Sequence, residues 1–132
     1  MSRRSSRPAR SARMAIVLAL AALIAASCAG SATPAPSFPA GSIIVTAKNR
    51  VFDTKELHVP ADTTVTLVLV NEESDLHNIA IRTGSGFDGD LIFRFDPVSI
   101  KTVVLTVDPI PKGSYFFLCE IHPAMSGTVV AD

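Results

Sequence analysis

The amino-acid sequence predicts an all-β protein, an antiparallel Greek-key sandwich of about seven or eight short strands. After Gly41 the apolar residues alternate with polar ones, and this period of two is typical of strands rather than helices. The same region is rich in β-branched residues, and clusters of Gly, Pro and Asp divide it at regular intervals. The chain has 132 residues, the size of one domain, so we expect a single hydrophobic core.

The expected strands can be placed one after another along the chain. Residues 42–47 contain an Ile-Ile-Val run, and residues 63–70 alternate Thr with Val and Leu, both of which favour strands. Turn signals separate the strands at residues 60–62, 84–86, 88–90 and 108–113. The predicted strands are residues 42–47, 57–59, 63–70, 77–81, 91–95, 99–107, 114–119 and 127–131.

The N-terminus has the features of an export signal. Five arginines precede an apolar run over residues 14–26, which is shorter than the about 20 residues that a membrane-spanning helix needs. A basic segment, a short apolar segment and small residues together describe a secretory signal that is removed. We therefore predict a signal peptide over residues 1–27. The Arg3-Arg4 pair leaves export by the general (Sec) or the twin-arginine (Tat) route open.

Cys28 follows Ala-Ala-Ser, and this sequence resembles the lipobox of bacterial lipoproteins. The resemblance implies that Cys28 is lipidated and holds the protein at the outer face of the cell membrane or in the periplasm, with lipid as its only membrane contact. Ordinary cleavage after Ala29 or Ala32 is the alternative and would give a secreted protein. Residues 28–40 are small and Pro-rich and predict a flexible linker, so the folded domain is expected over residues 41–132.

Removal of the signal leaves an acidic protein. The whole chain has 12 basic and 12 acidic residues, but five basic residues and no acidic residue precede Cys28. The remainder therefore has seven basic and 12 acidic residues, a net charge of −5. This charge argues against nucleic acid or anionic lipid as a direct partner and leaves basic protein partners open. We expect the domain to be a monomer.

A short C-terminal passage contains three side chains that bind metals. Cys119 ends one expected strand, Met125 nearly begins the next, and His122 lies between them. A tight loop of this length can turn a thiolate, an imidazole and a thioether toward one point. Two imidazoles, one thiolate and a distant axial thioether are the ligands of an electron-transfer copper site, whereas structural zinc prefers more thiolates.

The second imidazole must come from His58 or His77. His58 lies between Leu57 and Val59 in an alternating strand, which places it on the solvent face. His77 follows a polar loop and begins an expected strand, where it can face the end of the sandwich. A buried cysteine with unrelated His and Met residues is the alternative interpretation. The expected ligands of one copper ion are His77, Cys119, His122 and Met125.

With these residues identified, the chain resembles the cupredoxin family of plastocyanin and azurin, and its ligand loop is similar to that of amicyanin. The resemblance covers residues 41–132 and rests on His77-Asn78, on Cys119-x2-His122-x2-Met125, and on the aromatic residues 115–117. It implies a type 1 (blue) copper protein that transfers single electrons. It also implies that Asn78 braces the ligand loop from the neighbouring strand.

Two positions depart from the amicyanin pattern. Ile121 stands where proline is common, and its amide can donate a second hydrogen bond to the Cys119 sulfur, which would raise the reduction potential. Leu76 replaces the proline often found before the first histidine, which leaves that loop less rigid.

The resemblance further implies that His122 emerges through an apolar patch where redox partners dock, with Leu76, Pro123 and Ala124 as candidate members. A nearby acidic loop would steer a basic partner, or it is simply a solvated loop. The candidate acidic rim consists of Glu72, Glu73 and Asp75.

Electron transfer outside the cytoplasm is the predicted function, and copper storage or delivery is the alternative because it needs the same ligands. An enzyme is not expected, because Met125 fills the axial position that catalytic copper leaves open. The sequence does not encode the electron donor, the acceptor or the potential.

Overall fold

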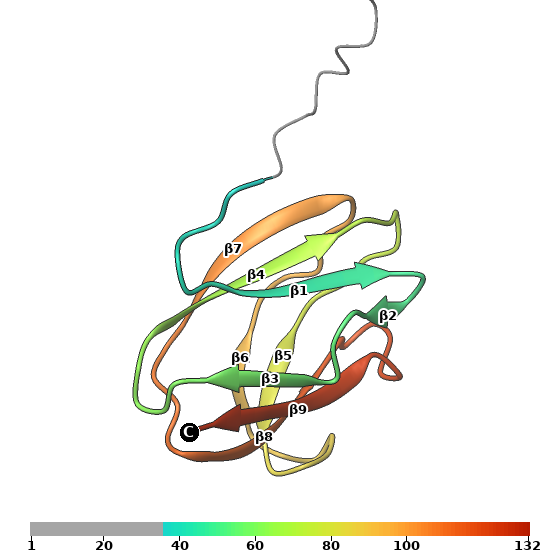
Figure 1. Cartoon of the computed structure of the whole chain (residues 1–132). Helices are drawn as coiled ribbons and strands as arrows, with labels where there is room; N and C mark the ends of the chain where they lie inside the picture. The colour runs from blue at the N-terminus through green and yellow to red at the C-terminus, as the bar shows by residue number, and fades with distance from the viewer. Residues whose placement is uncertain (1–35) are drawn as a thin grey trace, which may run out of the picture. The chain divides into compact units, whose positions relative to one another are not determined.

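The computed structural model describes residues 36–132, and within this range it contains nine strands and no helix (Figure 1). The predicted signal peptide, Cys28 and most of the predicted linker lie outside the described residues. Ser37–Asp132 forms one compact unit, and in the described range no helix is long and apolar enough to cross a membrane. The strands are β1 (Ile43–Lys48), β2 (Val51–Phe52), β3 (Glu56–Val59), β4 (Val65–Asn71), β5 (Ala80–Thr83), β6 (Leu91–Arg94), β7 (Lys101–Val107), β8 (Gly113–Leu118) and β9 (Ser126–Ala131).

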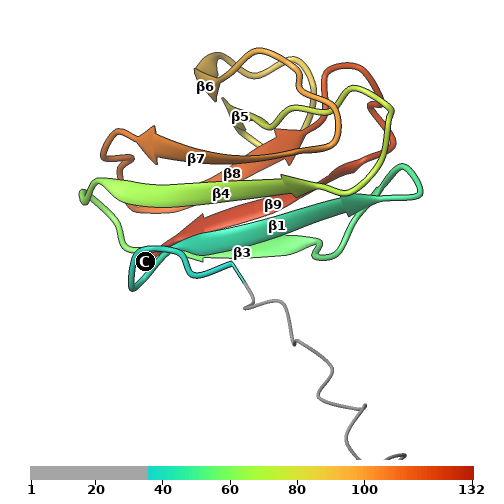
Figure 2. The same cartoon turned by 90° about the horizontal axis from the view of Figure 1, so that it is seen from above.

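The strands form two sheets that lie face to face (Figure 2). One sheet has the order β2-β1-β4-β7 and the other has the order β3-β9-β8-β5-β6. The predicted all-β sandwich is therefore confirmed, but two strand pairs, β1–β4 and β3–β9, are parallel rather than antiparallel. Between β1 and β4 the chain crosses to the other sheet and returns, so β4 runs beside β1 in the same direction. The alternation of residues shows which face of a strand is buried, but not which strand lies next to it.

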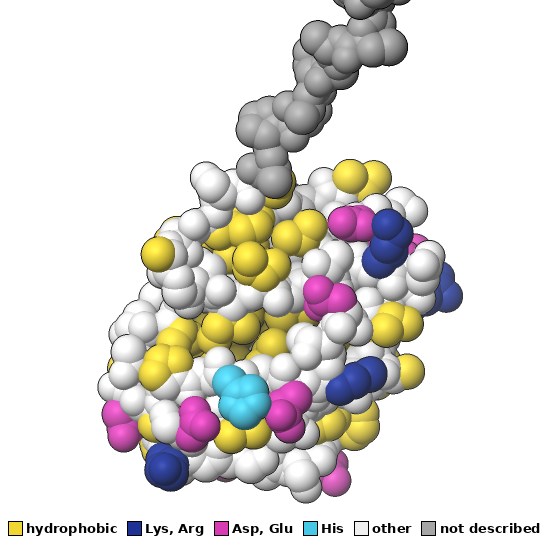
Figure 3. All heavy atoms as spheres, in the orientation of Figure 1, with side chains coloured by type: hydrophobic (Ala, Val, Ile, Leu, Met, Phe, Trp, Pro, Cys, Tyr) yellow, Lys and Arg dark blue, Asp and Glu magenta, His cyan; other side chains and the backbone are white. Residues whose placement is uncertain are grey.

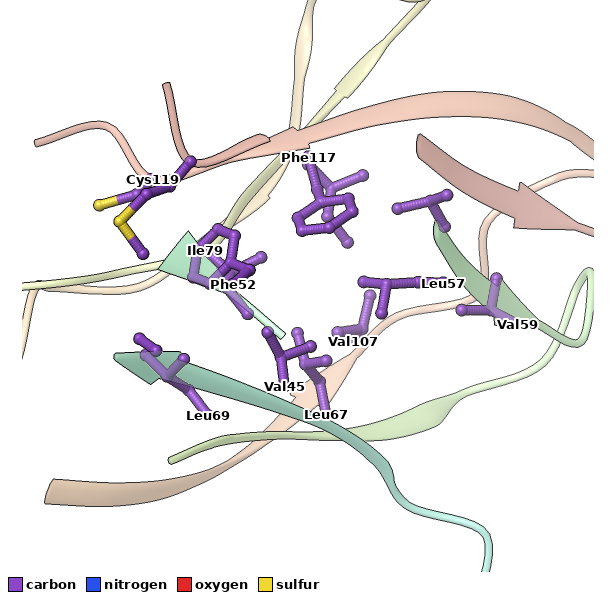
Figure 4. Close-up of a cluster of buried hydrophobic side chains, with 14 of the residues drawn as sticks. Val45, Phe52, Leu57, Val59, Leu67, Leu69, Ile79, Val107, Phe117 and Cys119 are labelled. Atoms are coloured by element: carbon purple, nitrogen blue, oxygen red, sulfur yellow. The ribbon is translucent and has the colours of Figure 1, made fainter. Parts of the chain in front are cut away.

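The inner faces of the two sheets enclose one hydrophobic core (Figure 4). In β3, Leu57 and Val59 are buried while Glu56 and His58 are exposed, which confirms the surface position predicted for His58. A glycine is required where β9 passes the residue before β3 in the same sheet: a Cβ on Gly127 would lie 2.3 Å from the backbone oxygen of Lys55. The fully buried side chains at the centre of the core include Val45, Phe52, Leu69, Ile79, Phe117 and Val129.

The strand boundaries differ from the prediction at the residues that carry the chemistry. His77 was expected to begin a strand, but it precedes β5 and pairs with Val98 in an isolated bridge. Cys119 was expected to end a strand, but β8 stops one residue earlier. The two-residue strand β2 was not predicted, because two residues carry no measurable periodicity. Asn49 and Arg50 form the tight turn before it, with φ of 54° and 56°.

Candidate metal centre

The predicted ligand residues come from two loops at one end of the sandwich (Figure 1). His77 is held by a two-way backbone pairing with Val98, with N to O distances of 3.0 and 2.9 Å. In the second loop, the Cys119 amide donates to the Met125 carbonyl (2.9 Å). The Met125 amide in turn donates to the His122 carbonyl (2.8 Å). These bonds close the loop between β8 and β9 tightly enough to bring its ligand residues together.

Three of the predicted ligand atoms face one another. The Cys119 Sγ lies 3.6 Å from the Nδ1 of His77 and 4.0 Å from the Nδ1 of His122. The two Nδ1 atoms are 3.3 Å apart. His77 and Cys119 are fully buried, and His122 is half-buried. The structure therefore brings together a thiol and two imidazoles that are up to 45 residues apart in the sequence.

The spacing of these atoms fits a metal ion. A triangle with sides of 3.3, 3.6 and 4.0 Å has a circumradius of about 2.1 Å, so one point is equidistant from all three atoms. That radius matches the distances of about 2.0–2.3 Å that metal ions keep from imidazole and thiolate ligands. Met125 is 1% exposed and is joined by backbone hydrogen bonds to both Cys119 and His122, so the thioether residue is buried beside the other three.

The chemistry of the donor set favours copper over other metals. Thiolate and thioether sulfur are soft ligands that select Cu(I), and imidazole suits both copper oxidation states. Structural zinc sites are usually closed by more thiolates. The four residues therefore fit the copper ligand set expected from the sequence.

The far side of the His77 ring is bound to a carboxylate. Its Nε2 lies 2.6 Å from the Oε1 of Glu73, whose side chain is 21% exposed. The same Glu73 oxygen accepts a hydrogen bond from the Arg50 backbone amide (2.8 Å). The pKa of Glu73 is lowered from its ordinary value, mainly by this backbone bond and also by His77.

The other acidic residues of this loop also have partners within the chain. Glu72 pairs with Lys48 at 2.8 Å, and Asp75 pairs with Arg50 at 2.5 Å. The hydrogen bond from the Arg50 side chain lowers the pKa of Asp75. On the face drawn in Figure 3, acidic and basic side chains are interspersed rather than gathered in one block. The candidate acidic rim is therefore largely compensated by neighbouring cations.

Asn78 connects the two ligand loops. It is fully buried, and its Oδ1 accepts a hydrogen bond from the Glu120 amide (2.9 Å). Its Nδ2 donates to the Glu120 carboxylate (2.8 Å) and to the Phe95 carbonyl (3.1 Å). The side chain of Glu120 is also 3.5 Å from Arg82. Asn78 thus joins its own loop to the residue after Cys119.

Ile121 is placed differently from the expectation. Its side chain is 47% exposed, and within residues 36–132 no hydrogen bond joins its amide to the Cys119 sulfur. Other apolar side chains near His122 in the sequence are also exposed. The exposed apolar residues of the two ligand loops are Leu76, Ile121, Pro123 and Ala124, which we call the apolar end residues.

Sequence reasoning missed the structural roles of Glu73 and Arg50. Glu73 looked like one of several solvated acids in a polar loop, although it is the acid that reaches a buried ring. Its partner Arg50 is 23 residues away in a turn that was not predicted. The four-residue spacing between Glu73 and His77 was the only local signal.

Comparison with known proteins places the chain in a family. The sequence model of the Cupredoxin-like domain matches residues 15–131. Amicyanin-alpha of Methylorubrum extorquens is 30% identical over 107 residues, covering 81% of this chain and 86% of the relative.

Solved structures show the same architecture. Auracyanin A of Chloroflexus aurantiacus, described as a "blue" copper protein, has a TM-score of 0.60 and 21% identity, covering 69% of this chain and 98% of that one. A reduced Cu(I) form of an amicyanin variant has a TM-score of 0.56 and 25% identity, covering 73% of this chain and 87% of that one.

Proposed function

Because the chain belongs to the cupredoxin-like family, we propose that it is a type 1 copper protein that carries single electrons between redox partner proteins. One copper ion would be held by His77, Cys119 and His122 and, more weakly, by Met125. The observation that carries this proposal is the position of three ligand atoms at one common distance, about 2.1 Å, from a single point.

The residues around the site are suited to electron transfer because they keep the ligands still. His77 is fixed through its backbone by Val98, and the backbone bonds of Met125 fix the second loop. Full burial of His77 and Cys119 excludes water from that side of the site. When bound, copper supplies a one-electron couple between Cu(I) and Cu(II), and a site that changes its geometry little transfers that electron with little rearrangement.

Electrons would enter and leave at the exposed end of the molecule. His122 is the only one of the four proposed ligands that is not fully buried in the described chain, and the apolar end residues lie in the same two loops. We place the docking of redox partners there. The chain would act as a monomer outside the cytoplasm, anchored by lipid on Cys28 or secreted, and not as an enzyme.

The proposal can be tested by adding cupric ion to the purified protein. We expect an intense visible absorption from bonding between copper and the Cys119 thiolate, together with reversible one-electron voltammetry. Cys119→Ser is the matched control, because it removes the sulfur and keeps a side chain of similar size. A colourless protein that gives up its copper readily to an acceptor would support copper delivery instead of electron transfer.

A further inference from the structure

The ligand loop between β4 and β5 contains three acidic side chains, and only one of them reaches a proposed ligand. Glu72 and Asp75 pair with the side chains of surface cations. The Glu73 carboxylate instead lies 2.6 Å from the Nε2 of His77, a ring that is fully buried. Of these three acidic side chains, Glu73 is therefore the one that can act directly on the ring of a proposed ligand.

The contact determines which nitrogen of His77 carries the proton. An ionised carboxylate only accepts hydrogen bonds, so the Nε2 of His77 must be the donor. In the neutral ring the lone pair then belongs to Nδ1, the atom that faces Cys119 and His122. Since Nδ1 is the atom that must bind the metal, the contact prepares His77 for binding before any metal arrives.

We propose that Glu73 is the positioning residue of His77: it sets the ring's tautomer and orientation and places a negative charge behind the ring. The first part concerns the chain alone, whereas the effect of the charge on copper rests on the proposed function. A carboxylate bonded to a ligand histidine makes the ring a stronger donor and orients it. This favours the more highly charged metal ion and so lowers the reduction potential.

Glu73 is itself held by the turn between β1 and β2. The Arg50 amide donates to the same Oε1 atom that contacts His77. Asn49 and Arg50 both have left-handed φ values, which is uncommon for residues other than glycine. The ion pairs of Lys48 with Glu72 and of Arg50 with Asp75 join the end of β1 and this turn to the same loop. The turn thus supports the first ligand from outside the loop that carries it.

His122 lacks this arrangement. In the part of the chain that the structure describes, the hydrogen-bond contacts of its ring are the Nδ1 contacts with Cys119 and His77, and no carboxylate pairs with the ring. The two imidazoles are therefore held unequally. A carboxylate orients His77 from behind, while His122 depends on its loop and on the metal.

Substitution of Glu73 can separate charge from hydrogen bonding. Both hydrogen bonds end on Oε1, so Glu73→Gln can keep an oxygen acceptor in place while it removes the charge. Glu73→Ala removes the acceptor as well. Glu72→Gln is the matched control, because it neutralises an adjacent acid that pairs with Lys48 and touches no proposed ligand.

The first measurement uses the metal-free protein and does not depend on copper. Nitrogen NMR of the imidazole rings, about two pH units above the ordinary histidine pKa of ~6.5, reports the tautomer of His77. We expect one tautomer with the proton on Nε2 in the unmodified protein, in Glu73→Gln and in Glu72→Gln, and a mixture in Glu73→Ala. A pure Nε2 tautomer in Glu73→Ala would overturn the positioning role, whatever the protein's function.

The second measurement uses the copper-loaded protein. We expect Glu73→Gln to shift the midpoint potential to a more positive value by more than Glu72→Gln does. Glu73→Ala is expected to weaken cupric ion binding by about ten- to a hundredfold, as for other residues that support metal ligands. Equal potentials in the two Gln variants would overturn the role of the charge. Failure of every variant and of the unmodified protein to bind copper would instead refute the proposed function.

Discussion

The two loops that supply the proposed ligands are built in different ways. The loop from Cys119 to Met125 holds three ligand residues in a short span and is closed by its own backbone hydrogen bonds. The loop before His77 supplies one ligand, and its support comes from Val98 and from the turn at Asn49 and Arg50. One loop of the site is thus determined by its own residues, whereas the other depends on distant parts of the fold. Substitutions that affect the two loops should therefore have different effects.

The largest effect is expected where the locally closed loop joins the sheet. In Gly127→Ala the new Cβ would lie 2.3 Å from the Lys55 carbonyl oxygen and 2.6 Å from the Phe117 ring. The Lys55 carbonyl is held by the Thr128 amide and Phe117 is fully buried, so neither can move aside easily, and we expect a loss of about 3–5 kcal/mol in the free energy of unfolding. Urea denaturation measures this loss. A loss below ~1 kcal/mol would show that β9 can move away from Lys55 without disturbing the fold.

The next effect tests the link between the two loops. Asn78→Ala removes three hydrogen bonds of a fully buried side chain and leaves the Glu120 amide without its acceptor. We expect a loss of about 2–4 kcal/mol in the free energy of unfolding, because polar groups that are shielded from water would lose their hydrogen-bond partner. A change below ~1 kcal/mol, measured in urea, would show that the loops hold together without this residue.

The two ligand loops also differ in how much of their structure could be predicted from the sequence. The three ligands after Phe117 could be predicted because they lie within one loop, and strands such as β4 could be predicted because their residues alternate. The parallel pairing of β1 with β4 and the contact of Glu73 with Arg50 could not, because both join residues that are distant in the sequence. Local patterns reveal burial and ligand spacing, whereas the neighbours of a loop are set by the whole fold.

A smaller effect should appear as the pH falls. The pKa of Glu73 and of Asp75 is lowered in the folded chain, from ordinary values of 4.5 and 3.8, mainly by hydrogen bonds from Arg50. The unfolded chain therefore binds protons at a higher pH than the folded chain does. Their contribution to stability is complete above these ordinary values and is lost as the pH falls through the lower folded values.

One substitution can test whether this pH dependence comes from the pairing of Asp75 with Arg50. Asp75→Asn in the metal-free protein should reduce the loss of unfolding free energy between about pH 5 and pH 2, because one shifted carboxyl group is absent. Unfolding by urea at a series of pH values measures the slope. The matched control is Asp88→Asn, which removes a carboxyl group outside both ligand loops. Equal slopes in the two variants would contradict the assignment.

The smallest effect is expected at Ile121. The sequence predicts that its amide donates to the Cys119 sulfur, so that Ile121→Pro would lower the midpoint potential. In the described residues that bond is not found, and the side chain is 47% exposed. From the structure we expect Ile121→Pro to shift the midpoint potential by less than Glu73→Gln does. A larger fall in potential, measured by redox titration, would restore the role predicted from the sequence.

In the proposed site, residues from both loops meet around one copper ion. X-ray absorption at the copper edge of the loaded protein measures the distances from the copper to these ligands. We expect one short copper–sulfur distance of about 2.2 Å and two copper–nitrogen distances of about 2.0 Å, with the short sulfur distance lost in Cys119→Ser. A copper ion surrounded by nitrogen and oxygen alone, with the same spectrum in Cys119→Ser, would contradict the proposed site.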